Sequence, residues 1–140
     1  MSDASEVQVA RGGCLCGAIR YEVRGPLPPV GMCHCSLCRR VSGAGSNAVL
    51  NVRAERFTLL SGTISEFRTS SGWGSFFCGS CGCPAPHRLS DGARVLVPAG
   101  TLDSDPGPRV AGHIFVGSKA SWNVIGDDAP QFEEFPAPRS

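Results

Sequence analysis

Eight cysteines, gathered in three groups, constrain this chain more than any other feature of its sequence. The groups are Cys14 and Cys16; Cys33, Cys35 and Cys38; and Cys78, Cys81 and Cys83. Closely spaced cysteines are typical of disulfide frameworks or of metal sites. Disulfides are rare where thiols are kept reduced, so the metal interpretation follows if the protein is cytoplasmic. A metal shared by two groups would join segments that are distant in the sequence.

The composition predicts one small, mainly β domain. The chain has 140 residues, of which 41% are hydrophobic, with 18 glycines and 11 prolines. Such a turn-rich chain favours short strands with little helix, and its modest core calls for bracing by metal or disulfide. We expect a flexible start and first strand over residues 1–11, a single zinc-braced domain over 12–135 and a tail over 136–140.

Alternating and β-branched segments predict the strands. Four of them follow one another closely and suggest an antiparallel meander, over residues 47–52, 57–60, 64–68 and 73–77. Others are expected at 8–11, 18–23, 87–89, 94–97 and 113–116. A single helical turn is predicted at 39–41, and another at 118–125 with Ser118 as its cap.

Charge and hydropathy exclude two classes of partner. The formal net charge is +1 and the longest basic run is Arg39-Arg40. Such a chain lacks the basic surface that grips a nucleic-acid backbone. No stretch approaches the roughly 20 apolar residues of a membrane span, and no signal peptide is evident. We therefore expect a cytoplasmic protein whose partners are small molecules.

The first and third cysteine groups predict a closed metal site. Cys14 and Cys16 form one pair on a tight turn, and Cys78 and Cys81 form another. Four thiolates in a tetrahedron suit zinc, and structural zinc sites are usually closed by four protein ligands. The ion would clamp the first hairpin to the middle of the chain.

The central group predicts a second zinc site that remains open. Cys33, Cys35 and Cys38 supply three thiols within six residues, one fewer than a closed tetrahedral site needs. An open position is characteristic of catalytic zinc, where a water or a substrate thiol binds. A thiol bound there would be a thiolate at neutral pH.

Several neighbouring residues leave alternatives open. Cys83 could replace Cys81, complete the second site, or be a small buried residue. His34 lies between two ligands, and in an extended turn its ring would point away from the metal, so a solvated or supporting histidine is favoured over the alternative of a metal ligand. His87 and His113 stand alone in strand contexts, where packing is the default role.

Three motifs resemble one known family, the glutathione-dependent formaldehyde-activating enzymes, which include the centromere protein V domain. The motifs are GGCLCGAIRY at residues 12–21, CHCSLCR at 33–39 and FFCGSCG at 76–82. A later KASW segment at 119–122 resembles the family's closing motif. The resemblance extends from Gly12 to about Phe135.

This resemblance implies small antiparallel sheets in a tent-like arrangement with two zinc ions per chain. The structural zinc would be held by Cys14, Cys16, Cys78 and Cys81, and the second by Cys33, Cys35 and Cys38. The implied activity is that of a carbon–sulfur lyase, joining glutathione or a similar thiol to formaldehyde or a related carbonyl, or reversing that step.

Other residues could contribute to substrate binding. Arg39, Arg40 and the loop from Gly43 to Gly45 could hold a substrate carboxylate, or the arginines could be solvated surface charges. Trp73 and Trp122 could wall a pocket, although burial in the core is the expected role for each.

Two readings compete with the enzyme. A zinc-braced binding module without catalysis would have two structural metals and no affinity for thiols. A redox or metal-storage role would require easily oxidised cysteines.

Overall fold

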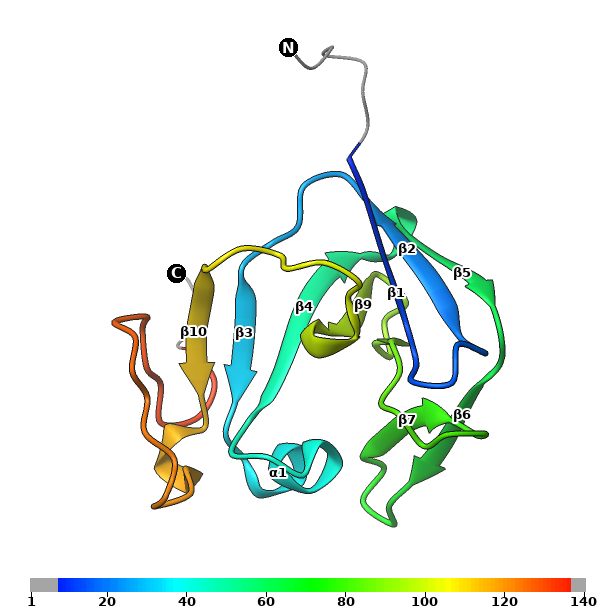
Figure 1. The fold of residues 1–140 in the computed structure, drawn as a ribbon. Coiled ribbons are helices and arrows are strands. Elements are labelled where there is room, and N and C mark those ends of the chain that lie inside the picture. The colour runs from blue at the N-terminus through cyan, green and yellow to red at the C-terminus, as the bar shows by residue number, and fades with distance from the viewer. Residues whose placement is uncertain (1–7, 137–140) are drawn as a thin grey trace, which may run out of the picture.

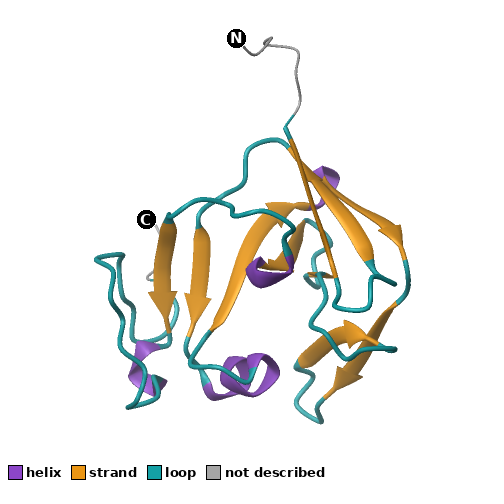
Figure 2. Cartoon of the chain, in the orientation of Figure 1, coloured by secondary structure: helices purple, strands orange, loops and turns teal. Residues whose placement is uncertain are grey.

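The computed structural model describes residues 8–136 and shows a mainly β protein built from three small sheets (Figures 1 and 2). The predicted fold class is therefore confirmed. The expectations for the flexible start and the tail fall largely on residues 1–7 and 137–140, which lie outside the described part of the chain. Within residues 8–136, no helix is long and apolar enough to cross a membrane.

The first sheet joins β1 (Val9–Gly13), β2 (Arg20–Arg24) and β5 (Phe57–Ser61), with β2 in the centre and both pairings antiparallel. Alternate side chains of β2 enter the core, since Tyr21 and Val23 are fully buried. The Tyr21 hydroxyl lies 2.7 Å from the Thr101 hydroxyl, so this buried ring also keeps its polar end paired.

The second sheet has five strands in the order β10-β3-β4-β9-β8. Their bounds are β3 (Val30–Cys33), β4 (Asn47–Arg53), β8 (His87–Arg88), β9 (Arg94–Pro98) and β10 (Val110–Ile114). Leu50, Val52, Val95 and Val97 form the core cluster with the buried residues of β2. Burial of each such side chain contributes about 1.5–3 kcal/mol of transfer free energy.

The third sheet is the hairpin of β6 (Ile64–Arg68) and β7 (Gly74–Cys78), which are paired antiparallel. It is joined to the first hairpin by a separate buried cluster of Cys14, Ile19, Cys78 and Ala85. This cluster includes the predicted cysteine ligands, so apolar packing and the cysteine group hold the same two segments together.

Among residues 8–136, helical structure is limited to one short α-helix and three 3₁₀ turns. They are α1 (Ser36–Ser42), η1 (Ala54–Arg56), η2 (Ala99–Thr101) and η3 (Val116–Ser118). The helix α1 is longer than the predicted turn at 39–41, because Cys35 caps its start and Gly43, with φ of 64°, ends it.

The predicted meander is wrong. Of the four strands expected to follow one another in one sheet, only β6 and β7 pair with each other. The strand β4 pairs instead with β3 and β9, while β5 joins β2. The alternating pattern identified each strand but could not identify its partner, because pairing depends on which faces the core covers.

Three further elements differ from the prediction. The short strand β3, in the first third of the chain, was not predicted, and it pairs in parallel with β10. The strand β10 begins at Val110 and ends before Phe115, whose φ of 58° breaks the extended chain. No helical turn spans 118–125, because the Lys119 ammonium donates to the Ala120 and Asn123 carbonyls and Lys119 itself is extended.

Candidate metal centres and their surroundings

The structure brings the thiols of Cys14, Cys16, Cys78 and Cys81 together, with their sulfur atoms all within 4.8 Å of one another. The Sγ atoms of Cys14 and Cys16 lie 3.6 Å apart, and those of Cys16 and Cys78 lie 3.8 Å apart. Thiolates arranged tetrahedrally around zinc at Zn–S distances of ~2.3 Å would stand ~3.8 Å apart. The group therefore has the spacing of a metal site.

Backbone amides help to assemble this group. The Ile19 amide donates to the Cys14 sulfur at 3.2 Å, and this bond lowers the pKa of Cys14 to about 6. The Ala18 amide has the largest single effect on Cys16 and acts to lower its pKa, but the neighbouring cysteine sulfurs, Cys14 first, and burial together outweigh it and raise that pKa to about 11. Cys14 thus ionises at a lower pH than an ordinary thiol, and Cys16 at a higher pH. Clustered thiols behave in this way when no cation lies between them, because the charge on one thiolate opposes ionisation of the next.

The second group of sulfurs stands where β3 ends and α1 begins. Cys33 is the last residue of β3, Cys35 is the N-cap of α1, and Cys38 is in its first turn. The Cys38 amide donates to the Cys35 sulfur at 3.3 Å. The three sulfur atoms lie within 4.8 Å of one another, and within residues 8–136 no histidine, cysteine or carboxylate completes the group to four.

These three thiols also influence one another electrostatically. A hydrogen bond from Cys38 lowers the pKa of Cys33 to about 6, and the same contact raises the pKa of Cys38 well above its ordinary value. Burial adds to the increase at Cys38. A cation bound by all three sulfurs would allow all three thiols to ionise together, because it favours the thiolate form of each ligand.

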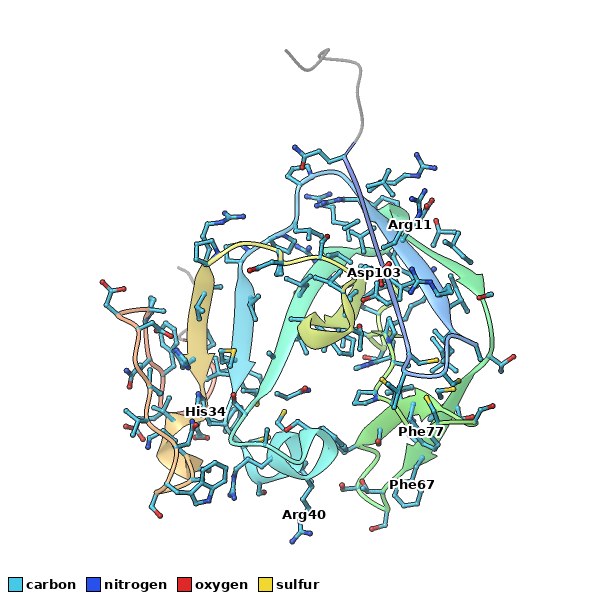
Figure 3. The ribbon with its side chains drawn as sticks, in the orientation of Figure 1. Arg11, His34, Arg40, Phe67, Phe77 and Asp103 are labelled. Carbon is cyan, nitrogen blue, oxygen red and sulfur yellow. The ribbon has the colours of Figure 1, made fainter. Side chains whose placement is uncertain are left out.

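His34 is not solvated, as one of the sequence-based alternatives allowed. Its side chain is only 1% exposed, and its Nε2 atom lies 2.8 Å from Nδ1 of His113. His113 is 3% exposed, and its Nε2 atom lies 3.0 and 3.1 Å from the two carboxylate oxygens of Asp127. Figure 3 shows His34 at the end of β3, between β10 and α1.

The Asp127 carboxylate determines which nitrogen donates in each hydrogen bond between His34, His113 and Asp127. An ionised carboxylate only accepts, so Nε2 of a neutral His113 carries the proton and its Nδ1 accepts from Nε2–H of His34. Burial, with His113 and Lys119 nearby, lowers the pKa of His34 and favours this neutral state. Nδ1 of His34 is buried and has no hydrogen-bond partner of ordinary geometry. The nearby Gly45 backbone acts to raise the pKa of His34, but it offsets only part of the decrease that burial causes.

Cys83 lies outside both sulfur groups. It is half-buried and packs against the cluster that contains Ile19 and Ala85. Its carbonyl accepts from the Cys78 amide at 2.9 Å, so its backbone helps to shape the turn that carries two ligands. All eight cysteines are free thiols in the structure.

The arginines and tryptophans lie around α1. Arg39, Arg40 and Trp122 border a shallow hollow together with Gly43. Within residues 8–136 neither arginine forms an ion pair, and Nε of Arg39 is buried without a partner. Trp122 is 70% exposed, so the expectation that it is buried in the core is wrong; the turn at residues 120–123 carries it outward.

A cavity of about 420 Å³ lies between α1 and the hairpin of β6 and β7. Trp73 lines this cavity and is half-buried. Trp73 therefore takes the pocket-lining role that the sequence allowed, but the other walls could not be predicted, because they come from five separate segments of the chain. His87, predicted only to pack in a strand, also lines it.

Comparisons with known proteins agree with this architecture. The sequence profile described as "Glutathione-dependent formaldehyde-activating enzyme" matches residues 9–118. A curated Halomonas elongata protein, provisionally named a glutathione-dependent formaldehyde-activating enzyme, is 30% identical over 125 residues, covering 81% of this chain and 79% of its own. A solved structure of a Rhodobacter sphaeroides protein superposes with a TM-score of 0.55 at 22% identity, over 67% of this chain and 88% of its own, and shows a shared fold.

Proposed function

The chain belongs to the glutathione-dependent formaldehyde-activating enzyme family, and we propose that it joins a small thiol such as glutathione to formaldehyde or a related carbonyl, or reverses that reaction. The observation that carries this proposal is the group of Cys33, Cys35 and Cys38. Its three sulfur atoms lie within 4.8 Å of one another, with no fourth protein ligand among residues 8–136.

We assign zinc to both sulfur groups, giving two ions per chain. The group of Cys14, Cys16, Cys78 and Cys81 would be closed and structural, since four thiolates complete a tetrahedron. The sulfur spacings of 3.6 and 3.8 Å support zinc there. Thiolate ligands favour soft or borderline ions over magnesium or calcium, which prefer oxygen.

The second ion would be held by the three sulfurs of β3 and α1. When bound there, zinc supplies a Lewis acid with one position free for a substrate atom and favours the thiolate form of a bound thiol. The protein fixes the three ligands through the N-cap at Cys35 and through the pairing of Cys33 with Asn47 in β4. Positioned ligands of this kind reduce the reorganisation that a reaction must otherwise include.

The reaction itself is an addition. The thiol releases its S–H proton to solvent, its sulfur forms a bond to the carbonyl carbon, the carbonyl π electrons move to oxygen, and the oxygen takes up a proton from solvent. The product is a hemithioacetal, an S-hydroxyalkyl thioether, and the reverse reaction restores thiol and carbonyl. Arg39 and Arg40 belong to the ligand helix α1, have no ion-pair partner among the described residues, and suit a carboxylate of the thiol substrate.

We also place this activity in the cytoplasm. The eight free thiols support a reducing compartment, because thiolate zinc sites survive where disulfides do not form. Glutathione and other small thiols are the expected partners.

Exchange spectroscopy tests the activity. Catalytic amounts of the zinc-loaded protein should speed the exchange of isotopically labelled formaldehyde between its free form and its glutathione adduct. Cys38→Ser should remove this acceleration, while Cys83→Ser, outside both sulfur groups, should keep it. Exchange at the uncatalysed rate with the wild-type protein, across thiols and carbonyls, would contradict the proposed function.

A further inference from the structure

The cavity of about 420 Å³ is larger than formaldehyde requires. Formaldehyde has two heavy atoms and is comparable with a water molecule, whose share of liquid volume is ~30 Å³. Pockets for small organic ligands span roughly 300–1,000 Å³, so this cavity falls within their range. If formaldehyde were the only carbonyl substrate, the carbonyl compound would fill only a small part of this volume.

The walls of the cavity are aromatic and apolar. Phe67, Trp73, Phe76 and Phe77 line one side, and Figure 3 shows Phe67 and Phe77 on the hairpin of β6 and β7. The Phe76 ring stacks on His87, with 4.1 Å between centroids and an angle of 7° between planes. This stacked pair presents a fixed flat surface, which suits another planar apolar group.

The charge carried by the described residues that line the cavity is positive. Of the side chains that the structure describes, Arg40 is the only permanently charged one that lines it, and none of the lining residues is a carboxylate. Figure 3 shows Arg40 extending from α1, away from the body of the protein. Burial lowers the pKa of His87, which keeps that ring neutral at pH 7. The cavity thus combines an apolar interior with one cation at its border, a combination that suits an uncharged apolar group attached to an anionic one.

The cavity is lined by neighbours of the three-cysteine group from two elements, although none of the three cysteines lines it. Leu37 and Val41 of α1 line it, and Cys38 lies between them in the helix. Asn47 also lines it, and its Cα is paired with that of Cys33 between β4 and β3. A group attached to a carbonyl carbon at the cysteine site could therefore extend into the cavity.

We propose that this cavity binds an aromatic or comparably bulky apolar substituent on the carbonyl carbon, so that the substrate is the thiol adduct of an aromatic aldehyde. This inference rests on the proposed function and specifies its substrate class. The chemistry remains an addition: the thiol loses its S–H proton to solvent, the sulfur bonds to the aldehyde carbon as the C=O π bond breaks, and the aldehyde oxygen gains a proton from solvent. Glutathione's carboxylates would remain outside the apolar interior, near Arg40.

Stable thioethers test the pocket without requiring turnover. Calorimetry on the zinc-loaded protein should show that S-benzylglutathione binds at least about tenfold more tightly than S-methylglutathione, since even one methylene in an apolar pocket is worth roughly tenfold or more. Val49→Phe, which fills the cavity from β4, should abolish this preference. Val124→Phe, the same change at an exposed loop position, should retain it.

The outcomes separate this inference from the proposed function. Equal affinity for the two thioethers, or a benzyl preference that survives cavity filling, would overturn the inference even if formaldehyde were turned over. A benzyl preference abolished by Val49→Phe would support it even if formaldehyde exchange were uncatalysed. If Val49→Phe loses zinc or its cooperative unfolding, Ser75→Phe fills the same cavity from β7 and is judged by the same criterion.

Discussion

Nε2 of His34 lies 2.8 Å from Nδ1 of His113, although the two residues are 79 positions apart in the sequence. His34 is part of the turn that carries Cys33 and Cys35, while His113 belongs to β10 and reaches Asp127 beyond it. This pair of buried rings ties the three-cysteine group to the C-terminal segment. It supplements the parallel pairing of β3 with β10, in which the His34 amide donates to the Ile114 carbonyl at 3.0 Å.

Removing the His113 ring, which links His34 to Asp127 by hydrogen bonds, should destabilise the protein. His113→Ala leaves the buried Nε2–H of His34 without an acceptor, and an unpaired buried polar group costs about 1–3 kcal/mol. Chemical denaturation of the zinc-loaded protein should show at least this loss in the free energy of unfolding. His113→Gln provides the rescue, since its amide can accept from His34 and donate to Asp127. Equal stability of the alanine and glutamine variants would argue against the hydrogen-bond chain.

The four-cysteine group should be essential for folding. Cys78→Ser removes one ligand, and zinc binding in small zinc domains contributes about 10–16 kcal/mol, as much as a whole domain's stability of about 5–15 kcal/mol. We expect this variant to be insoluble or to lack a cooperative melting transition. Cys83→Ser is the matched control, because Cys83 is near the same turn but outside the sulfur group. Loss of folding in both variants alike would mean that the ligands are assigned wrongly.

The two cysteine sites and their surroundings differ in how far the sequence predicted them. Cys14 with Cys16, and Cys33 with Cys35 and Cys38, are local patterns, so spacing alone was enough to group them. Joining the first pair to Cys78 and Cys81 rested on the expectation that structural zinc sites are closed by four ligands, which left open whether Cys83 replaces Cys81. Whether zinc occupies them remains a prediction.

The contacts of His34 could not be predicted in the same way. Its partner depends on the parallel pairing of β3 with β10, and β3 itself is a four-residue strand with a glycine between a proline-rich segment and the cysteines. Likewise, the outward turn of Trp122 follows from the Lys119 ammonium taking the carbonyls of Ala120 and Asn123. Such side-chain contacts override local propensity and have no signal in the sequence pattern.

Gly12 should not tolerate a side chain. A Cβ atom there would lie 2.3 Å from the Tyr21 hydroxyl and 2.5 Å from the Thr101 carbonyl oxygen, both in well-packed surroundings. We expect Gly12→Ala to reduce the free energy of unfolding by about 1–3 kcal/mol, the usual cost of overpacking. Gly100→Ala is the control, since nothing lies within 4 Å of its added Cβ. Thermal melts in which the two variants match would contradict the close approach at Gly12.

His87 should make stability depend on pH. Burial, and then the nearby Arg68, lower its pKa below the ordinary value of 6.5. The unfolded chain therefore binds a proton before the folded one does, so stability is lost as the pH falls below about 6.5 and until it reaches the folded-state pKa. Between about pH 7.5 and pH 5.5, His87→Phe should lose less stability than wild type, while protonation of the cysteine ligands affects both proteins equally. Parallel pH profiles would show that His87 is not held in its neutral form.

The central claim is that one sulfur group is closed and the other open to a thiol. Cobalt in place of zinc tests it directly, because the absorption of a thiolate–cobalt site changes when a further sulfur binds. The account predicts two cobalt ions per chain and a spectral change on adding glutathione that is absent in Cys38→Ser, which should bind only one. Two ions with a spectrum that glutathione leaves unchanged would contradict it, because both sites would then be closed.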